Sequence, residues 1–217
     1  PSLPGGEGNE EVALRFDSNY EYDREAEVTV TAGDISRSVT ITQRGRLGGT
    51  NFPHWTELPS IEPDQNTFFY THYTKLKDGR DVRNYSLFYD RSTYTSYWIA
   101  YPMHNSYMGT GRSDKWDYDP KIPRGWQVNY SSAWGANYYD RGHQIASADR
   151  NATVNKSNPT DMNVQTFYYT NITPQRWQLN QQKWESLESY LRGKVANNAD
   201  TIWVVTGAML RSAGGSE

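Results

Sequence analysis

The sequence predicts an α+β domain of antiparallel strands and one long helix, preceded by a short acidic β segment. Three observations support this. Aromatic and β-branched runs recur at 68–74, 85–89 and 95–101, as strands require. A single stretch, 180–195, has helical periodicity. Near residue 45 the composition changes, which marks a boundary.

The first segment is predicted to consist of strands. Apolar and polar residues alternate at 12–16, 28–30 and 39–41, as in half-buried strands. The last two are joined by a short turn in which Gly33 is free to adopt a positive φ. We therefore expect a β-hairpin that is too small to fold alone.

Charge separates this segment from the rest of the chain. Residues 1–45 contain nine acidic and four basic residues, whereas residues 46–217 contain sixteen and eighteen, and the whole chain has a net charge of -3. A linker at 44–53 has three glycines and a proline in ten residues. We expect domains at 1–45 and 46–217. The near-neutral balance argues against a simple polycationic nucleic-acid binder but permits local phosphate binding.

The second segment is predicted to contain a hairpin, long loops, a helix and a late strand. Asp78-Gly79 suits the hairpin turn, and 103–137 shows no clear period and is expected to form loops. A helix should follow Gln175, and 201–206 is expected to be a buried strand. The predicted helix has one core-facing stripe, formed by Trp184, Leu187, Leu191 and Val195.

Composition excludes several classes of protein. Cysteine is absent, which removes disulfides, thiol nucleophiles and Cys-ligated metals. No apolar run reaches the ~18 residues of a membrane span. The 17 tyrosines and 8 tryptophans supply much of the surface that can form a core.

One candidate for chemistry is the string Asp140-Arg-Gly-His143. Arginine offers a rigid fork of donors for phosphate, and histidine has the side-chain pKa nearest neutrality. Gly142 would allow a sharp turn that aims His143 away from the sheet, and Asp140 could orient the backbone or pair with an arginine. The alternative is a structural histidine, which is commoner in short motifs.

A second candidate lies on the predicted helix. Asn180 and Glu188 are eight residues apart, roughly 80° around the helix and about 12 Å along it. An amide oxygen and a carboxylate on one face suit a hydrated Mg²⁺ ion. The alternative is that Asn180 caps the helix and Glu188 is a solvated surface charge.

Together these motifs resemble a known family. Asp140-Arg-Gly-His143, Asn171-Ile-Thr-Pro-Gln175 and Leu179-Asn-Gln-x-x-Trp-x-x-x-Glu188 occur in order within fifty residues. The chain resembles the DNA/RNA non-specific endonucleases, the ββα-metal group that includes endonuclease G and the Serratia-type nuclease. The resemblance spans roughly 80–217. It implies the ββα-metal fold, with an antiparallel sheet and one long site helix.

The resemblance also implies roles for individual residues. His143 matches the general base that activates water, and Asn180 matches the single direct protein ligand of Mg²⁺. Glu188 matches the carboxylate that holds the waters of that ion. Arg141 and Arg192 match arginines that face the phosphate. We therefore expect His143 and Asn180 to line one pocket.

The implied substrates are DNA and RNA, cut without sequence specificity, and Mn²⁺ is an alternative to Mg²⁺ because oxygen ligands discriminate poorly between them. Asn171 matches an asparagine that supports the site. Ala146 stands where the family commonly has proline, which should change loop rigidity. Family members continue past the Thr206-Gly207 pair, so we expect the C-terminal strands to be missing and a completing fragment to be a candidate partner.

Residues 28–45 resemble the end of a BACON-type β-sandwich, a module of exported proteins, which implies a secreted or cell envelope (periplasmic) location. The main alternative function is a carbohydrate- or surface-binding module with a vestigial, inactive nuclease fold. A secreted toxin with an immunity protein is a third. The sequence leaves open the biological role, the preference between DNA and RNA, and the oligomeric state.

Overall fold

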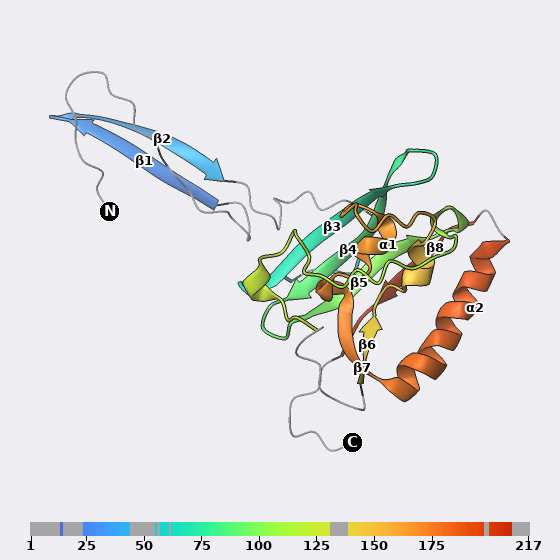
Figure 1. The fold of residues 1–217 in the computed structure, drawn as a ribbon. Coiled ribbons are helices and arrows are strands. Elements are labelled where there is room, and N and C mark those ends of the chain that lie inside the picture. The colour runs from blue at the N-terminus through green and yellow to red at the C-terminus, as the bar shows by residue number, and fades with distance from the viewer. Residues whose placement is uncertain are drawn as a thin grey trace, which may run out of the picture.

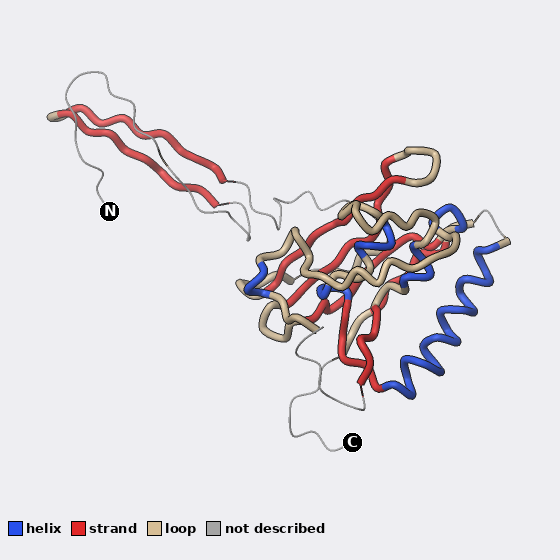
Figure 2. Tube along the Cα trace, in the orientation of Figure 1, coloured by secondary structure: helices blue, strands red, loops and turns tan. Residues whose placement is uncertain are grey.

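The computed structural model describes residues 14, 24–43, 55, 57–60, 62–130, 139–197 and 200–209. Within them the chain is α+β, with antiparallel sheets and one long helix, as predicted (Figures 1 and 2). The strand predicted at 12–16 lies outside the described residues apart from Leu14. No helix in the described ranges combines the length and apolar character needed to cross a lipid bilayer.

The predicted N-terminal hairpin is present. Strands β1 (Arg24–Ala32) and β2 (Ile35–Gln43) pair in antiparallel register, with Ala32 opposite Ile35. Gly33 has a φ of 59°, which explains why glycine stands in the turn. The two strands form a sheet of their own (Figure 1).

A four-stranded antiparallel sheet forms the centre of the second segment, in the order β3-β4-β5-β8. Its strands are β3 (Thr67–Lys75), β4 (Asp81–Asp90), β5 (Thr95–Met103) and β8 (Ile202–Thr206). The turn between β3 and β4 contains Gly79 at a φ of 85°, which confirms the predicted Asp-Gly turn. Gly207 follows β8 where a β-carbon would collide with the carbonyl oxygen of Tyr97, so the Thr-Gly pair reflects close backbone packing.

A second, two-stranded sheet and the long helix lie beside this sheet. Strand β6 (Tyr139–His143) pairs with β7 (Ile172–Arg176), and a π-helical turn (η5, Leu179–Trp184) continues into α2 (Glu185–Ala196). Two antiparallel strands and a helix therefore form the expected ββα unit (Figure 1). Short helical turns occupy the connections: η1 (Asn105–Tyr107), η2 (Arg124–Trp126), η3 (Ser147–Arg150), α1 (Met162–Gln165) and η4 (Tyr169–Asn171).

The main core is built largely from aromatic residues of the central sheet. Its buried members include Phe68, Tyr85, Leu87, Tyr89, Trp98, Ile99 and Met103, joined by Ile145 and Val195 from outside the sheet. Tyr85 and Tyr89 bury their rings while each hydroxyl donates to a backbone carbonyl, of Gln165 and Trp126 respectively. This is how a chain rich in tyrosine forms a core.

Two sequence predictions of burial were wrong. Only Val195 of the helix stripe is buried; Leu191 packs partly on the core and Leu187 is 47% exposed. The physical reason is that no described segment packs over the helix face that carries Leu187. The strand predicted at 201–206 is present as β8, but it is the edge strand, and only Val204 is buried.

Candidate active site

A cavity of about 490 Å³ lies between β6, the start of the long helix and the loop before β6. Its lining includes six residues that the sequence analysis singled out, Asp140, Arg141, His143, Asn180, Glu188 and Arg192. It also includes residues that the sequence did not indicate, among them Arg112, Trp116 and Glu185. His143 from β6 and Asn180 from η5 therefore face one common space.

His143 is the last residue of β6, so it projects from a strand rather than from a turn after it. Gly142 precedes it without a positive φ, and the predicted sharp turn is wrong. Glycine is required there for a different reason: a β-carbon would lie 2.6 Å from the Cβ of Gln175 on the paired strand β7. The close approach of β7 thus fixes the position of His143.

The environment of His143 keeps its imidazole neutral. Its side chain is half-buried, while its Nε2 atom is shielded from solvent and has no hydrogen-bond partner among the described residues. Burial and the positive charges of Arg112 and Arg141 together lower the pKa of His143 to about 3, against the opposing charge of Asp114. The structure thus holds a neutral proton acceptor at the cavity.

The position of Asn180 is fixed by Asp140. The Asp140 carboxylate oxygen Oδ2 accepts hydrogen bonds from Nδ2 of Asn180 at 2.9 Å and from Nε2 of Gln181 at 2.8 Å. Asp140 therefore orients the helix start, and neither predicted role, pairing with an arginine or orienting local backbone, describes it. The alternative that Asn180 caps the helix is also wrong, because Gln178 occupies that position and Asn180 lies inside the turn.

Glu188 is not a solvated surface charge. Its side chain is only 19% exposed, and burial raises its pKa to about 7, with the charge of Asp149 adding to the effect and Arg192 opposing it. Arg192 lies between the two acids, with NH1 2.9 Å from Asp149 Oδ1 and 3.8 Å from Glu188 Oε2. Asp149 is itself buried, and burial raises its pKa. This cluster places two buried acidic groups and an arginine on one wall of the cavity.

Asn171 does not line the cavity. It is fully buried in η4, where Nδ2 donates to the carbonyls of Ile145 and Thr166 and Oδ1 accepts from the Ile145 amide. Its own carbonyl accepts from the Gln144 amide at 3.0 Å. Asn171 therefore clamps the backbone directly after His143.

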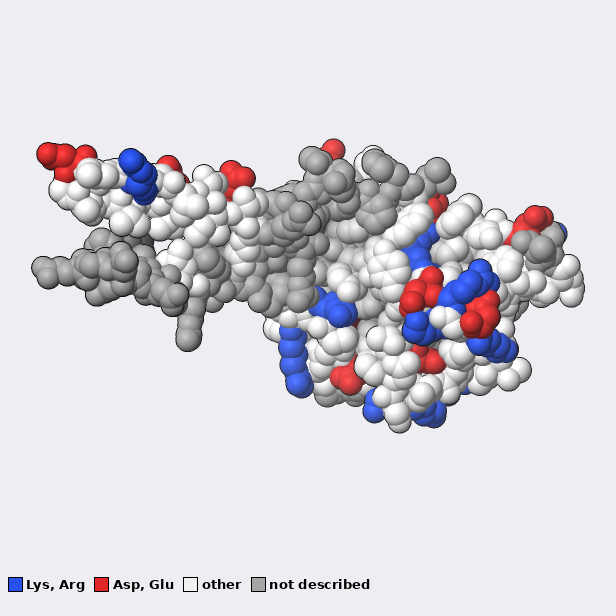
Figure 3. All heavy atoms as spheres, turned by 90° about the horizontal axis from the view of Figure 1, so that it is seen from above, with Lys and Arg blue, Asp and Glu red and all other residues white. Residues whose placement is uncertain are grey.

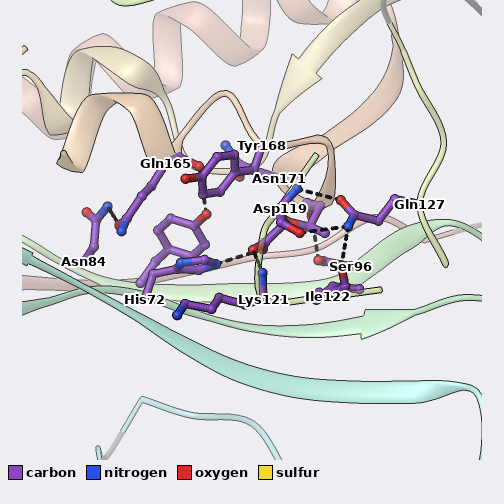
Figure 4. Close-up of polar contacts among 12 residues, drawn as sticks. His72, Asn84, Ser96, Asp119, Lys121, Ile122, Gln127, Gln165, Tyr168 and Asn171 are labelled. Carbon is purple, nitrogen blue, oxygen red and sulfur yellow. Dashed lines mark hydrogen bonds and ion pairs between the residues drawn. The ribbon is translucent and has the colours of Figure 1, made fainter. Parts of the chain in front are cut away.

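A buried polar network holds the turn that carries Asn171 (Figure 4). The Asp119 oxygen Oδ2 is 2.8 Å from His72 Nε2 and accepts from the Thr170 hydroxyl at 2.9 Å. Ser96 in β5 donates to the Thr170 carbonyl at 2.7 Å. Hydrogen bonds to His72 and to the Lys121 amide hold the pKa of Asp119 below its usual range despite burial. The turn that carries Asn171 is thus tied to the central sheet.

The remaining histidines have structural environments in the described region. His72 belongs to the buried network, and the Nδ1 atom of His104 accepts from the Ser106 amide to cap η1. His54 lies outside the described residues.

Two cavity residues were missed by the sequence interpretation. Arg112 donates from Nε to Asp114 at 2.6 Å and from NH1 to Ser147 at 2.8 Å, and Trp116 lies under Arg141. Both come from the loop at 103–137, in which no periodicity or short motif marks individual residues. Only the fold brings them beside His143.

The oxygen donors at the cavity fit a hydrated divalent cation. Because Asp140 engages the amide nitrogen of Asn180, the amide oxygen is the atom left to accept or ligate, and the Glu188 carboxylate lies about two turns further along the helix. No group of three or more His, Cys, Asp or Glu side chains forms a metal cage in the described part of the chain. The donor set therefore suits an ion that keeps most of its water, as Mg²⁺ does.

Two family models match this chain, each over a different part of it. Residues 64–214 match the family model for DNA/RNA non-specific endonucleases, and residues 2–44 match BACON, an N-terminal binding domain. The first match covers most of the chain. This protein belongs to the DNA/RNA non-specific endonuclease family.

Its curated relatives include nucleases from bacteria and animals. The chain is 35% identical over 128 residues to a nuclease of Nostoc sp., covering 58% of this chain and 44% of that protein. It is 31% identical over 130 residues to a nuclease of Serratia marcescens, covering 58% and 46%. Human mitochondrial nuclease EXOG is 27% identical over 136 residues, covering 61% and 34%. The chain thus spans less than half the length of these relatives.

Among solved structures, the EndoG/EndoGI complex aligns with a TM-score of 0.46 at 24% identity, covering 57% of this chain and 49% of that chain.

Proposed function

We propose that this protein is a metal-dependent endonuclease that hydrolyses phosphodiester bonds of DNA and RNA without sequence specificity. The observation that carries the proposal is the common cavity of His143, Arg141, Asn180 and Glu188. A structural histidine and a surface carboxylate would have no reason to share one cavity with three arginines.

In this proposal His143 is the general base. The imidazole is neutral and lines the cavity, so it can accept a proton from the attacking water. The rigid β6–β7 pairing and the Asn171 clamp hold it in place, so that Asn171 supports the base without touching substrate.

Three arginines bind the phosphate in this proposal. Arg112 and Arg192 each contact a carboxylate, whereas Arg141 forms no ion pair within the described residues. Arg141 is therefore the guanidinium most available to the phosphate, and it opposes the negative charge that builds up in the transition state. Arg192 supplies a further positive charge beside Glu188, and Arg112 supplies one beside His143.

Asn180 and Glu188 are the residues proposed to hold a Mg²⁺ ion, with Mn²⁺ as the alternative. When bound, such an ion supplies Lewis-acid stabilisation of the phosphate and of the leaving oxygen. The amide oxygen of Asn180 would be the direct ligand, and the Glu188 carboxylate would accept hydrogen bonds from water on the ion. Asp140 fixes the amide in the orientation that this requires.

The absence of sequence specificity is part of the proposal. The cavity groups assigned here to substrate binding are arginines, which suit phosphates, and phosphate contacts give affinity without sequence information. On the face drawn in Figure 3, basic side chains are interspersed with acidic ones. Binding should therefore depend on local contacts at the cavity.

The domain organisation and location are also proposals. We infer a binding segment at 1–45 and a nuclease domain at 46–217, supported by the BACON match at 2–44 and the nuclease match at 64–214. A secreted or cell-envelope location rests on the BACON resemblance alone.

Digestion of plasmid DNA and of RNA, with and without Mg²⁺, tests the function. His143→Ala and Asn180→Ala should each abolish a Mg²⁺-dependent activity, while His104→Ala, a histidine outside the cavity, should retain it. Unchanged cutting by both cavity variants would remove the assignment. Glycan binding by a protein that cuts neither substrate would instead support a binding module with a vestigial nuclease fold.

A further inference from the structure

Two arginines of the cavity each lie over an aromatic ring. The guanidinium carbon of Arg141 is 3.9 Å from the centroid of the Trp116 ring, and that of Arg112 is 4.8 Å from the Phe167 ring. Both distances are within the range of cation–π attraction. For Arg141, this ring takes the place of an acidic partner.

The same two rings enclose His143. Its imidazole centroid is 5.3 Å from Trp116 and 5.1 Å from Phe167, the latter in an edge-to-face arrangement at 85°. The two rings also meet each other edge to face, at 4.9 Å and 87°. Base, rings and arginines thus form one continuous group of contacts.

Backbone pairing fixes the two rings relative to each other. The Asp117 amide donates to the Phe167 carbonyl at 3.3 Å, and the Tyr169 amide donates to the Asp117 carbonyl at 3.0 Å. An isolated parallel bridge joins Asp117 to Tyr168. The residue after Trp116 is therefore bound to the residues around Phe167. A ring on an otherwise irregular loop is held as firmly as one on a strand.

We propose that Trp116 and Phe167 are positioning residues, which hold Arg141, His143 and Arg112 as one preorganised unit at the cavity. This inference rests on the proposed nuclease function. Trp116 acts through Arg141, by holding the guanidinium over the face of its ring, and Phe167 acts through Arg112. Both rings restrict the imidazole between them. Such restriction matters most in the transition state, where donors already in position cost no reorganisation.

A double-mutant cycle on Trp116 tests the inference in the full chain. With saturating Mg²⁺, Trp116→Leu should lower kcat about tenfold, a loss between those of an exposed and of a fully desolvated cation–π contact, with a much smaller change in KM. Trp116→Phe, which keeps an aromatic face, should recover most of the loss. In an Arg141→Ala background, Trp116→Leu should cost less than about threefold, because the guanidinium it positions is gone and only its looser ring contact with His143 remains to be lost.

Two comparisons separate positioning from general stability. In an Arg112→Ala background, Trp116→Leu should still cost about tenfold, because that arginine contacts the other ring. Tyr118→Leu removes a similar stack, with Arg124 at 4.3 Å, from the same loop but outside the cavity lining, and should leave kcat unchanged. If circular dichroism shows that Trp116→Leu does not fold, Trp116→Met provides the same cycle.

The outcomes separate a failure of the positioning role from a failure of the proposed nuclease function. An equal loss from Trp116→Leu with and without Arg141, or an equal loss from Tyr118→Leu, would overturn the positioning role. If His143→Ala and Arg141→Ala both retain full activity, the proposed function fails, whatever Trp116 does. If they lose activity and Trp116→Leu does not, only the present inference fails.

Discussion

Replacing Glu188 by glutamine should stabilise the metal-free protein, and only at neutral and alkaline pH. Glu188 is 81% buried by side-chain area and has an acidic neighbour in Asp149, so its ionised form is disfavoured in the folded state. Glutamine has the same shape and no charge. The substitution therefore removes the cost of ionising this carboxyl group without removing its packing.

The size of the effect follows from the pKa. The Glu188 pKa rises from 4.5 to about 7. When the carboxyl group is ionised, this shift lowers the free energy of unfolding by roughly 3 kcal/mol. Between these two values the folded state binds the proton and the unfolded state does not, so stability falls as pH rises. Below pH 4.5 both states are protonated and the cost vanishes. Above pH 7 it is fully present.

Urea unfolding of the wild type and Glu188→Gln at pH 4.5 and pH 8, in chelator, measures this directly. The variant should exceed the wild type by roughly 3 kcal/mol at pH 8 and by much less at pH 4.5. Glu185→Gln, an exposed neighbour that also lines the cavity, is the matched control and should show no such gain. An equal difference between wild type and Glu188→Gln at both pH values would refute the reasoning.

Three further predictions concern the support of the site. Asp140→Ala should weaken Mn²⁺ binding about 10- to 100-fold in a calorimetric titration, because the ligand amide loses its orientation; an unchanged dissociation constant would contradict this. Asn171→Ala removes the side-chain partners of three buried backbone groups, the amide and carbonyl of Ile145 and the carbonyl of Thr166. It should lower the free energy of unfolding in urea by about 3 kcal/mol, and a loss under about 1 kcal/mol would show that the clamp is weak. Gly142→Ala should lower the free energy of unfolding in urea by about 2 kcal/mol or more, because the added methyl group collides with β7. Gly125→Ala, whose added methyl group meets nothing within 4 Å, is the control in the same assay, and equal effects of the two substitutions would disprove the close-packing explanation.

The local elements could be predicted from sequence because their causes are local. Gly33 and Gly79 stand in turns where a positive φ is needed, and β-branched and aromatic runs formed the flanking strands. The motif residues His143 and Asn180 could be named because their spacing matches a family pattern. Their meeting in one cavity depends on the pairing of β6 with β7; the resemblance implied the ββα fold but not this pairing.

Other features could not be predicted because they depend on contacts between distant segments. Leu187 satisfies a helical stripe, yet the helix face it lies on is not covered within the described residues. Arg112 and Trp116 lie in an irregular loop, and contacts with segments distant in sequence bring that loop to the base, among them the backbone bridge from Asp117 to Tyr168. Asp140 binds two amides from a helix forty residues away, a partnership that no spacing indicates.

The most direct test of the central claim is a crystal structure of His143→Ala with Mn²⁺ and a short DNA duplex, read by anomalous scattering. The account predicts a single manganese peak beside the Asn180 amide oxygen, with a backbone phosphate between it and the truncated residue 143. A manganese peak elsewhere, or a duplex bound away from this cavity, would contradict it.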